Sequence, residues 1–202
     1  VLNIDIGKAV CYSGYRKGQT PGEIFPTYNQ VKEDLLIINK TWKYIRLYSC
    51  DFHSRTVLKV IKNEKLDLKV MLGCYIEAEI NNYACPWGGE YSEDQLKINK
   101  KRNLERIDLL SELGKKYPKI IFSLSIGNEA CVSWTDHMVP VESVVNYAKI
   151  LKSKAKQPIT FCENYVTWVN KLEKLVEVLD FISIHTYPQW ENAYIDDALN
   201  YT

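Results

Sequence analysis

The repeated alternation of short apolar runs with amphipathic segments most constrains how this 202-residue sequence folds. Apolar runs bounded by polar residues predict strands, and apolar positions with a period near 3.6 predict helices. Strands are expected at Lys8–Tyr12, Tyr44–Tyr48, Leu68–Tyr75, Ile120–Ile126, Ile159–Cys162 and Phe181–His185. Helices are expected at Tyr28–Asn39, Arg55–Glu64, Ser92–Tyr117 (with Leu104, Ile107 and Leu110 inward), Val141–Lys154 and Leu172–Leu179. This order predicts a parallel sheet in an α/β fold.

Two architectures satisfy this pattern, an open doubly wound sheet and a (β/α)8 TIM barrel. The open sheet commonly carries G-x-G-x-x-G after its first strand, and the loop Tyr12–Gly18 lacks it. A barrel collects functional residues just past the carboxyl ends of its strands. Polar and aromatic residues do follow the expected strands, and they are Tyr12, Tyr48, Asp51, Tyr75, Glu77, Glu79, Asn128, Glu129, Glu163, His185 and Tyr187. We therefore predict a TIM barrel.

The length of the chain limits how much of a barrel it can form. A complete barrel usually takes about 250 residues. This sequence supplies about the first six strands, so we expect residues 1–202 to form a single domain that lacks its C-terminal part. Six parallel strands leave two open sheet edges, where we expect association with another chain or further sequence.

Composition excludes several classes of protein. The chain has 26 Lys and Arg against 25 Asp and Glu, so neither a nucleic acid nor an anionic membrane surface is an expected partner. No apolar stretch approaches the ~20 residues of a membrane span, and Val1–Lys8 has no signal-peptide pattern. The six cysteines and three histidines are scattered, so we expect free, buried thiols and neither a metal nor a cofactor.

The segment Ser125–Glu129 follows an apolar strand and brings a glycine, an amide and a carboxylate to the barrel mouth. A carboxyl group in a partly apolar site can act as a general acid near neutral pH. The amide of Asn128 can bind a sugar 2-hydroxyl, a contact that strengthens in an oxocarbenium-like transition state. The structural alternative is a loop cap, but the strand-end position favours Glu129 as a catalytic residue.

Further groups converge on the same rim. Aromatic rings there could stack on sugar faces or pack in the core, and they are Trp87, Trp134, Tyr165, Trp168, Tyr187 and Trp190. Arg46 lies inside an apolar strand and needs a partner, either a catalytic carboxylate or a structural salt bridge. Glu163 and His185 end their strands and can reach the mouth.

Several segments, taken in order, resemble family 17 of the glycoside hydrolases, the β-1,3-glucanases of a large clan of retaining (β/α)8 enzymes. The bacterial and fungal branch is the most similar. The segments are Val10–Gly14, Pro86–Gly89, Ser125–Glu129, Val132–His137, Thr160–Tyr165 and Phe181–Pro188.

The resemblance implies that Glu129 is the general acid/base and that Asn128 reads the sugar 2-hydroxyl. It implies a glucan groove lined by Tyr12, Arg46, Tyr48, Glu79, Glu163, His185, Tyr187 and Trp190, to which the rim position adds Trp134. The family's nucleophile is a glutamate on the seventh strand, in a segment reading Glu-Ala/Ser/Thr-Gly-Trp that this sequence lacks. Ser49 stands where close relatives tend to carry Asp.

We therefore expect a retaining β-1,3-glucan hydrolase, endo- or exo-acting, whose isolated chain is inactive without a nucleophile. A β-1,3-glucan transglycosylase and a non-catalytic glucan-binding protein remain alternatives. The expected partner is β-1,3-glucan or its oligosaccharides. Such a substrate favours an extracellular, periplasmic or cell-surface location, whereas unpaired cysteines favour a reducing compartment.

Overall fold

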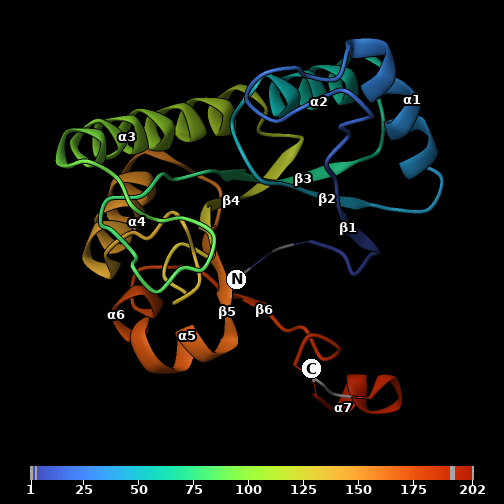
Figure 1. The fold of residues 1–202 in the computed structure, drawn as a ribbon. Helices are drawn as coiled ribbons and strands as arrows, with labels where there is room; N and C mark the ends of the chain where they lie inside the picture. The colour runs from blue at the N-terminus through green and yellow to red at the C-terminus, as the bar shows by residue number, and fades with distance from the viewer. Residues whose placement is uncertain (1, 3, 192–193, 202) are drawn as a thin grey trace.

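Six parallel strands form one curved sheet in the computed structural model, which describes residues 2, 4–191 and 194–201. They are β1 (Ala9–Cys11), β2 (Tyr44–Leu47), β3 (Lys69–Cys74), β4 (Ile121–Asn128), β5 (Ile159–Asn164) and β6 (Ser183–His185). The strands pair in chain order, each parallel to the next. The sheet curves as a half-barrel with the helices on its outer side (Figure 1), which confirms the predicted partial TIM barrel.

The helices follow the strands as expected, with most boundaries within a few residues of the prediction. They are α1 (Tyr28–Ile38), α2 (Phe52–Asn63), α3 (Glu93–Lys116), α4 (Val141–Lys154), α5 (Tyr165–Lys171), α6 (Glu173–Val176), the 3-10 turn η1 (Ile195–Asp197) and α7 (Ala198–Tyr201). Side-chain caps fix several starts: Thr27 forms a capping box, and Asp51, Ser92 and Asn164 accept backbone N–H groups.

Some expectations from the sequence are wrong. Leu104 of α3 is 38% exposed, because Asn103 faces inward instead and bonds the backbone of the loop after β3. Helix α2 begins at Phe52 rather than Arg55, since the side chain of Asp51 caps it. Where one helix is expected around Leu172–Leu179 the structure has only the short α6, and an unpredicted helix, α5, begins directly after β5.

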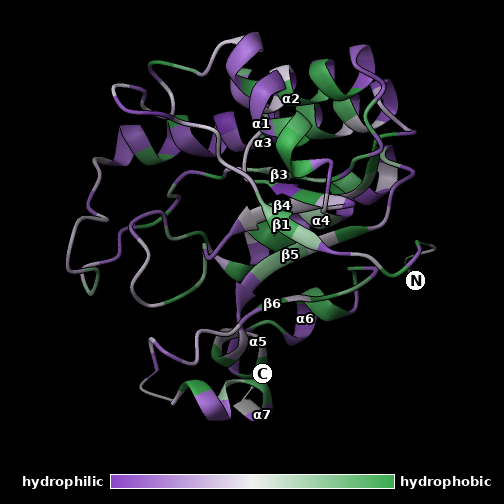
Figure 2. Cartoon of the chain, turned by 90° about the vertical axis from the view of Figure 1, so that its right-hand side faces the viewer, coloured by the Kyte–Doolittle hydropathy of each residue, from purple (hydrophilic) through white to green (hydrophobic). Residues whose placement is uncertain are grey.

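The core lies between the sheet and the helix layer. Fully buried residues of β3, β4 and β5 form its centre, including Leu72, Leu124 and Phe161. Figure 2 shows hydrophobic residues in the central strands and an alternation of hydrophilic and hydrophobic residues along the helices. All six cysteines are free, as expected, but Cys11 is exposed and Cys85 is only half-buried.

The two ends of the sheet remain open within the described residues, because β1 and β6 each pair on one side only. Beyond β6, η1 and α7 extend away from the half-barrel (Figure 1). No helix in the described part of the chain is long and apolar enough to cross a membrane.

Replacing Leu124 with alanine is expected to lower the free energy of unfolding by about 2–5 kcal/mol, because it opens a cavity in the buried centre of β4. Urea unfolding measures the change. Leu199→Ala is the control, since Leu199 is 93% exposed and should change stability by less than about 0.5 kcal/mol. Equal effects at the two positions would contradict this core.

Candidate active site

The end of β4 holds Glu129 in an unusual backbone conformation. Gly127 has φ 67° and Glu129 has φ 48°, both in the left-handed region. A Cβ at Gly127 would stand 2.8 Å from the Ile76 side chain, so only glycine fits there. The N–H of Glu129 donates to the carbonyl of Cys162 on β5 at 2.9 Å, which fixes the turn to the neighbouring strand.

The carboxylate of Glu129 is held from β6 and remains accessible. His185 Nδ1 lies 2.8 Å from Glu129 Oε1, and the Tyr187 hydroxyl makes a long contact of 3.5 Å to the same oxygen. The side chain of Glu129 is 22% exposed, so a ligand can reach it. The structure thus brings together three of the predicted site residues from two strand ends.

Arg46 joins this group from β2. Its Nη1 lies 2.9 Å from His185 Nε2, its Nη2 donates to Asn128 Oδ1 at 2.5 Å, and its guanidinium lies 4.7 Å from the centre of the Tyr48 ring. The prediction that a carboxylate pairs with Arg46 is wrong within the described residues. The amide of Asn128 and the imidazole of His185 contact its guanidinium instead. Arg46 Nε is buried with no hydrogen-bond partner among the described residues.

The contact with Arg46 also orients the side chain of Asn128. Arginine has only donors, so Asn128 must turn its carbonyl oxygen toward Arg46. Its NH2 group is then directed elsewhere and is available to donate to a ligand. This is the orientation that binding a sugar hydroxyl oxygen requires.

Glu163 does not line an accessible surface, which corrects its expected place in a groove. It is fully buried on β5, where Oε2 accepts the N–H of Cys131 at 2.9 Å and Oε1 accepts that of Asn164 at 2.7 Å. Burial raises the pKa of Glu163 to about 7. Glu163 therefore fixes the loop that follows Glu129 rather than touching a ligand.

Two other expected groove residues are tied to helices. Glu79 accepts hydrogen bonds from Asn103 of α3, at 3.0 Å, and from Tyr147 of α4. Tyr12 is buried, and its hydroxyl donates to Asp34 at 2.9 Å. These contacts make Glu79 a link between two helices and leave Tyr12 only a small accessible part.

The predicted aromatic rim has both exposed and buried members. Four of its rings are exposed, those of Trp87, Trp134, Tyr187 and Trp190. The prediction that Trp168 lies on the rim is wrong. Its side chain is only 7% exposed, packs on Phe161 and donates from Nε1 to the Ser183 carbonyl.

The loops after β3 and β4, which carry Trp87 and Trp134, are bound to each other. Asn82 Nδ2 donates to the carbonyls of Ser133 and Thr135, and the Cys85 thiol donates to that of Trp134. Trp134 therefore stands on a loop that its neighbour braces.

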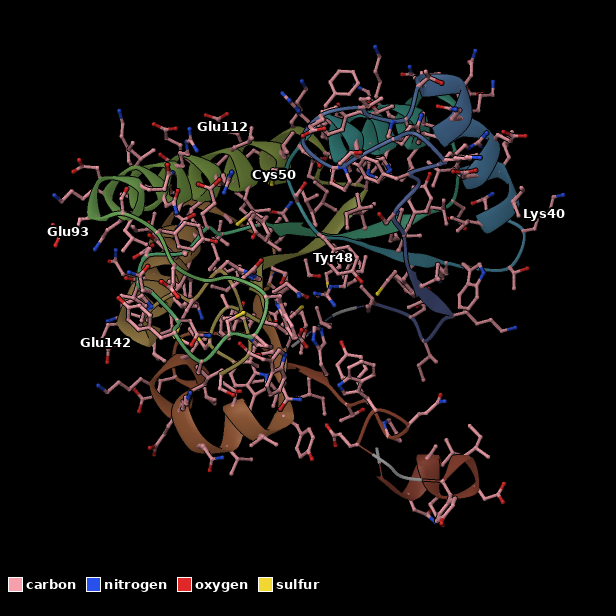
Figure 3. All side chains as sticks on the ribbon, in the orientation of Figure 1. Lys40, Tyr48, Cys50, Glu93, Glu112 and Glu142 are labelled. Carbon is pink, nitrogen blue, oxygen red and sulfur yellow. The ribbon has the colours of Figure 1, made fainter. Side chains whose placement is uncertain are left out.

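A cavity of about 640 Å³ opens beside this cluster, over the ends of β1, β2 and β3. Four tyrosines line it together with polar residues at the start of α2; the tyrosines are Tyr12, Tyr15, Tyr48 and Tyr75. Tyr48 belongs both to the cavity and to the Arg46 contact, so the cavity and the Glu129 cluster meet there. Figure 3 shows Tyr48 near the middle of the view, far from Glu112 and Glu142 at the periphery.

His137 is a supporting residue that the sequence reasoning did not single out. Its Nε2 donates to the backbone carbonyl of Asn128 at 3.0 Å, and its ring packs on Tyr75 at 4.9 Å. It therefore braces the turn before Glu129 and connects it to the cavity wall. The only signal was its place in one of the segments that carry the family resemblance.

A half-barrel with a carboxylate, an amide and exposed aromatic rings at its strand ends is the construction of a carbohydrate-active barrel enzyme. Residues 9–202 match the BtgE/BtgC glycoside hydrolase domain family, and the chain belongs to that family. The predicted class is thereby confirmed. A comparison with curated protein sequences finds no match.

Solved structures share the fold. An endo-laminarinase from Formosa Hel1_33_131 has a TM-score of 0.74 and 24% identity over 94% of this chain and 52% of that chain. A family 17 β-1,3-glucanosyltransferase from Rhizomucor miehei has a TM-score of 0.65 and 16% identity over 94% and 60%. An active-site mutant of the Rhizomucor enzyme was solved with laminaritriose (TM-score 0.67, 16% identity, 94% and 60% coverage). The chain thus spans about half the length of the laminarinase.

Replacing Glu163 with glutamine is expected to remove a pH dependence of stability. The folded-state pKa of Glu163, about 7, lies above its ordinary value of 4.5, so the folded state binds more protons between these pH values. Its contribution is therefore full below pH 4.5 and falls as the pH rises through 7, by about 3 kcal/mol. Urea unfolding from pH 4 to 8 measures this slope, which Glu163→Gln should flatten.

Glu112→Gln serves as the control for this comparison, because Glu112 is exposed on α3. It should keep the slope of the wild type. A Glu163→Gln protein with an unchanged slope would contradict the assignment to Glu163.

Proposed function

We propose that this chain forms part of the single catalytic domain of a retaining β-1,3-glucan hydrolase in which Glu129 is the general acid/base. The observation that carries the proposal is the accessible Glu129 carboxylate at the end of β4, held by His185 and flanked by Asn128. Membership of a glycoside hydrolase family supports the reaction class. The laminarinase and glucanosyltransferase neighbours support β-1,3-glucan as the substrate.

The reaction would run in two displacements. A carboxylate nucleophile attacks the anomeric carbon while Glu129 protonates the glycosidic oxygen, so that the bond breaks and the glucan fragment leaves as an alcohol. The Glu129 carboxylate then takes a proton from water, whose oxygen attacks the anomeric carbon and releases the nucleophile. Asn128 donates to the 2-hydroxyl through the amide group that Arg46 leaves free.

Among the residues that the structure describes, none is identified as the nucleophile of this scheme. Glu163 is on the adjacent strand, but it is fully buried and both of its oxygens accept backbone N–H groups. We infer that a seventh strand would carry the nucleophile. Arg46 Nε is buried and has no hydrogen-bond partner among the described residues.

The tyrosine-lined cavity is proposed to bind glucosyl units away from the scissile bond. Aromatic faces stack on sugar C–H groups, and Ser49 and Asp51 at its wall offer hydrogen-bonding oxygens. Tyr48, which belongs both to the cavity and to the Arg46 contact, supports binding of these units as part of the same glucan chain.

A β-1,3-glucan transglycosylase is the second candidate. The exposed Trp134, on its braced loop, would offer a surface for an acceptor sugar, which then replaces water in the second displacement. Products longer than the substrate distinguish transfer from hydrolysis. Binding of glucan without any turnover would indicate a glucan-binding protein instead.

Replacing Glu129 with glutamine is expected to lower the release of reducing sugar from a soluble β-1,3-glucan by about 10²–10⁴-fold, because the general acid/base is lost. The assay uses the full-length protein. Glu112→Gln, on the outer surface of α3, is the control and should keep wild-type activity. An active Glu129→Gln enzyme would show that another group transfers the proton.

Replacing Tyr15 with alanine is expected to raise KM for a glucan oligosaccharide about tenfold with little change in kcat, because one stacking face of the cavity is lost. The exposed Tyr83, which does not line the cavity, is the matched control as Tyr83→Ala. An unchanged KM in Tyr15→Ala would argue against sugar binding in the cavity.

A further inference from the structure

His185 lies between the positively charged Arg46 and the negatively charged Glu129. The donors and acceptors of these two contacts determine where the ring proton lies. Arg46 Nη1 lies 2.9 Å from Nε2 of the ring, and Glu129 Oε1 lies 2.8 Å from Nδ1. A guanidinium has no acceptor, so Arg46 donates and Nε2 accepts through its lone pair. The single ring proton is then on Nδ1, from which it is donated to Glu129.

Other groups around the ring act on its charge in opposite directions. Burial and Arg46 lower the pKa of His185, whereas hydrogen bonding to Cys162 of β5 and to Glu129 raises it, and these effects alone favour a raised pKa. Tyr187 and the buried Glu163 also face this group of side chains. A raised pKa would make the ring cationic at neutral pH, with an N–H on both nitrogens.

The geometry contradicts a cationic ring. An N–H on Nε2 would point at the N–H of Arg46 across 2.9 Å and would bring two positive charges together. Arg46 cannot easily move away, because it also donates to Asn128 and stacks over Tyr48. The hydrogen-bond geometry therefore outweighs the effects that favour protonation.

We propose that Arg46 is a positioning residue that keeps His185 neutral, with its proton on Nδ1, so that Glu129 receives a hydrogen bond from an uncharged donor. The proposal rests on the acid/base role of Glu129 for its meaning. An imidazolium at this position would stabilise the ionised carboxylate and oppose its use as an acid. The neutral ring donates to Oε1 of Glu129. No described residue bonds Oε2 of Glu129, which is therefore the oxygen that can carry the catalytic proton.

The state of the ring can be measured without substrate. In protein labelled with 15N at histidine, long-range 1H–15N correlation spectra distinguish the two neutral tautomers and the imidazolium, and His185→Gln assigns the signals. We expect a protonated Nδ1 and an unprotonated Nε2 for His185 at pH 7. A signal from imidazolium, or from the Nε2-protonated tautomer, would overturn the proposal.

The role of Arg46 is tested by replacing it. In Arg46→Met, the titration midpoint of His185 should rise by at least about one pH unit, because a positive charge and a competing donor are lost. Arg46→Lys keeps a charged donor and should retain a midpoint closer to that of the wild type. Arg102→Met, which removes an exposed arginine of α3, should change nothing.

Equal midpoints in wild type, Arg46→Met and Arg46→Lys would overturn the positioning role even if the tautomer is as expected. If Arg46→Met does not fold, the wild-type spectrum still tests the tautomer of His185, and Arg46→Lys still tests the role of Arg46. These measurements do not depend on turnover. A failure of the tautomer prediction can therefore be distinguished from a failure of the proposed acid/base role of Glu129.

Discussion

The site depends on the backbone turn at the end of β4. Gly127 and Glu129 both adopt left-handed conformations there, and a non-glycine residue in this region costs about 1–3 kcal/mol. The surroundings sustain this cost: the Glu129 N–H bonds to β5, His137 holds the Asn128 carbonyl, and Glu163 anchors Cys131. Together, these contacts hold the Glu129 carboxylate in place at the edge of the sheet.

The side chains around that carboxylate are ordered by their donors and acceptors. Arg46 can only donate, and it therefore fixes the orientation of the Asn128 amide and the acceptor nitrogen of His185 together. The consequence reaches Glu129 through His185. One half-buried arginine on β2 thereby determines how two groups from distant strands face a ligand.

The sequence predicted the architecture and the placement of Glu129 because both follow from local patterns. Apolar runs identify strands, and the ends of parallel strands meet at one edge. Long-range pairing could not be predicted, because the partners of Arg46, Glu163 and Trp168 are side-chain or backbone groups more than a dozen residues away. The prediction that Leu104 faces inward is wrong for a related reason. The neighbouring Asn103 faces inward instead, because it bonds to the backbone of the loop after β3.

The most direct test of the account is the anomeric configuration of the sugar first released from a β-1,3-linked oligosaccharide, followed by 1H NMR at early times in the full-length protein. Two displacements at the anomeric carbon retain the configuration, so the account predicts that the β-anomer appears first and then mutarotates. An initial α-anomer would mean a single displacement by water and would contradict a covalent intermediate formed opposite Glu129.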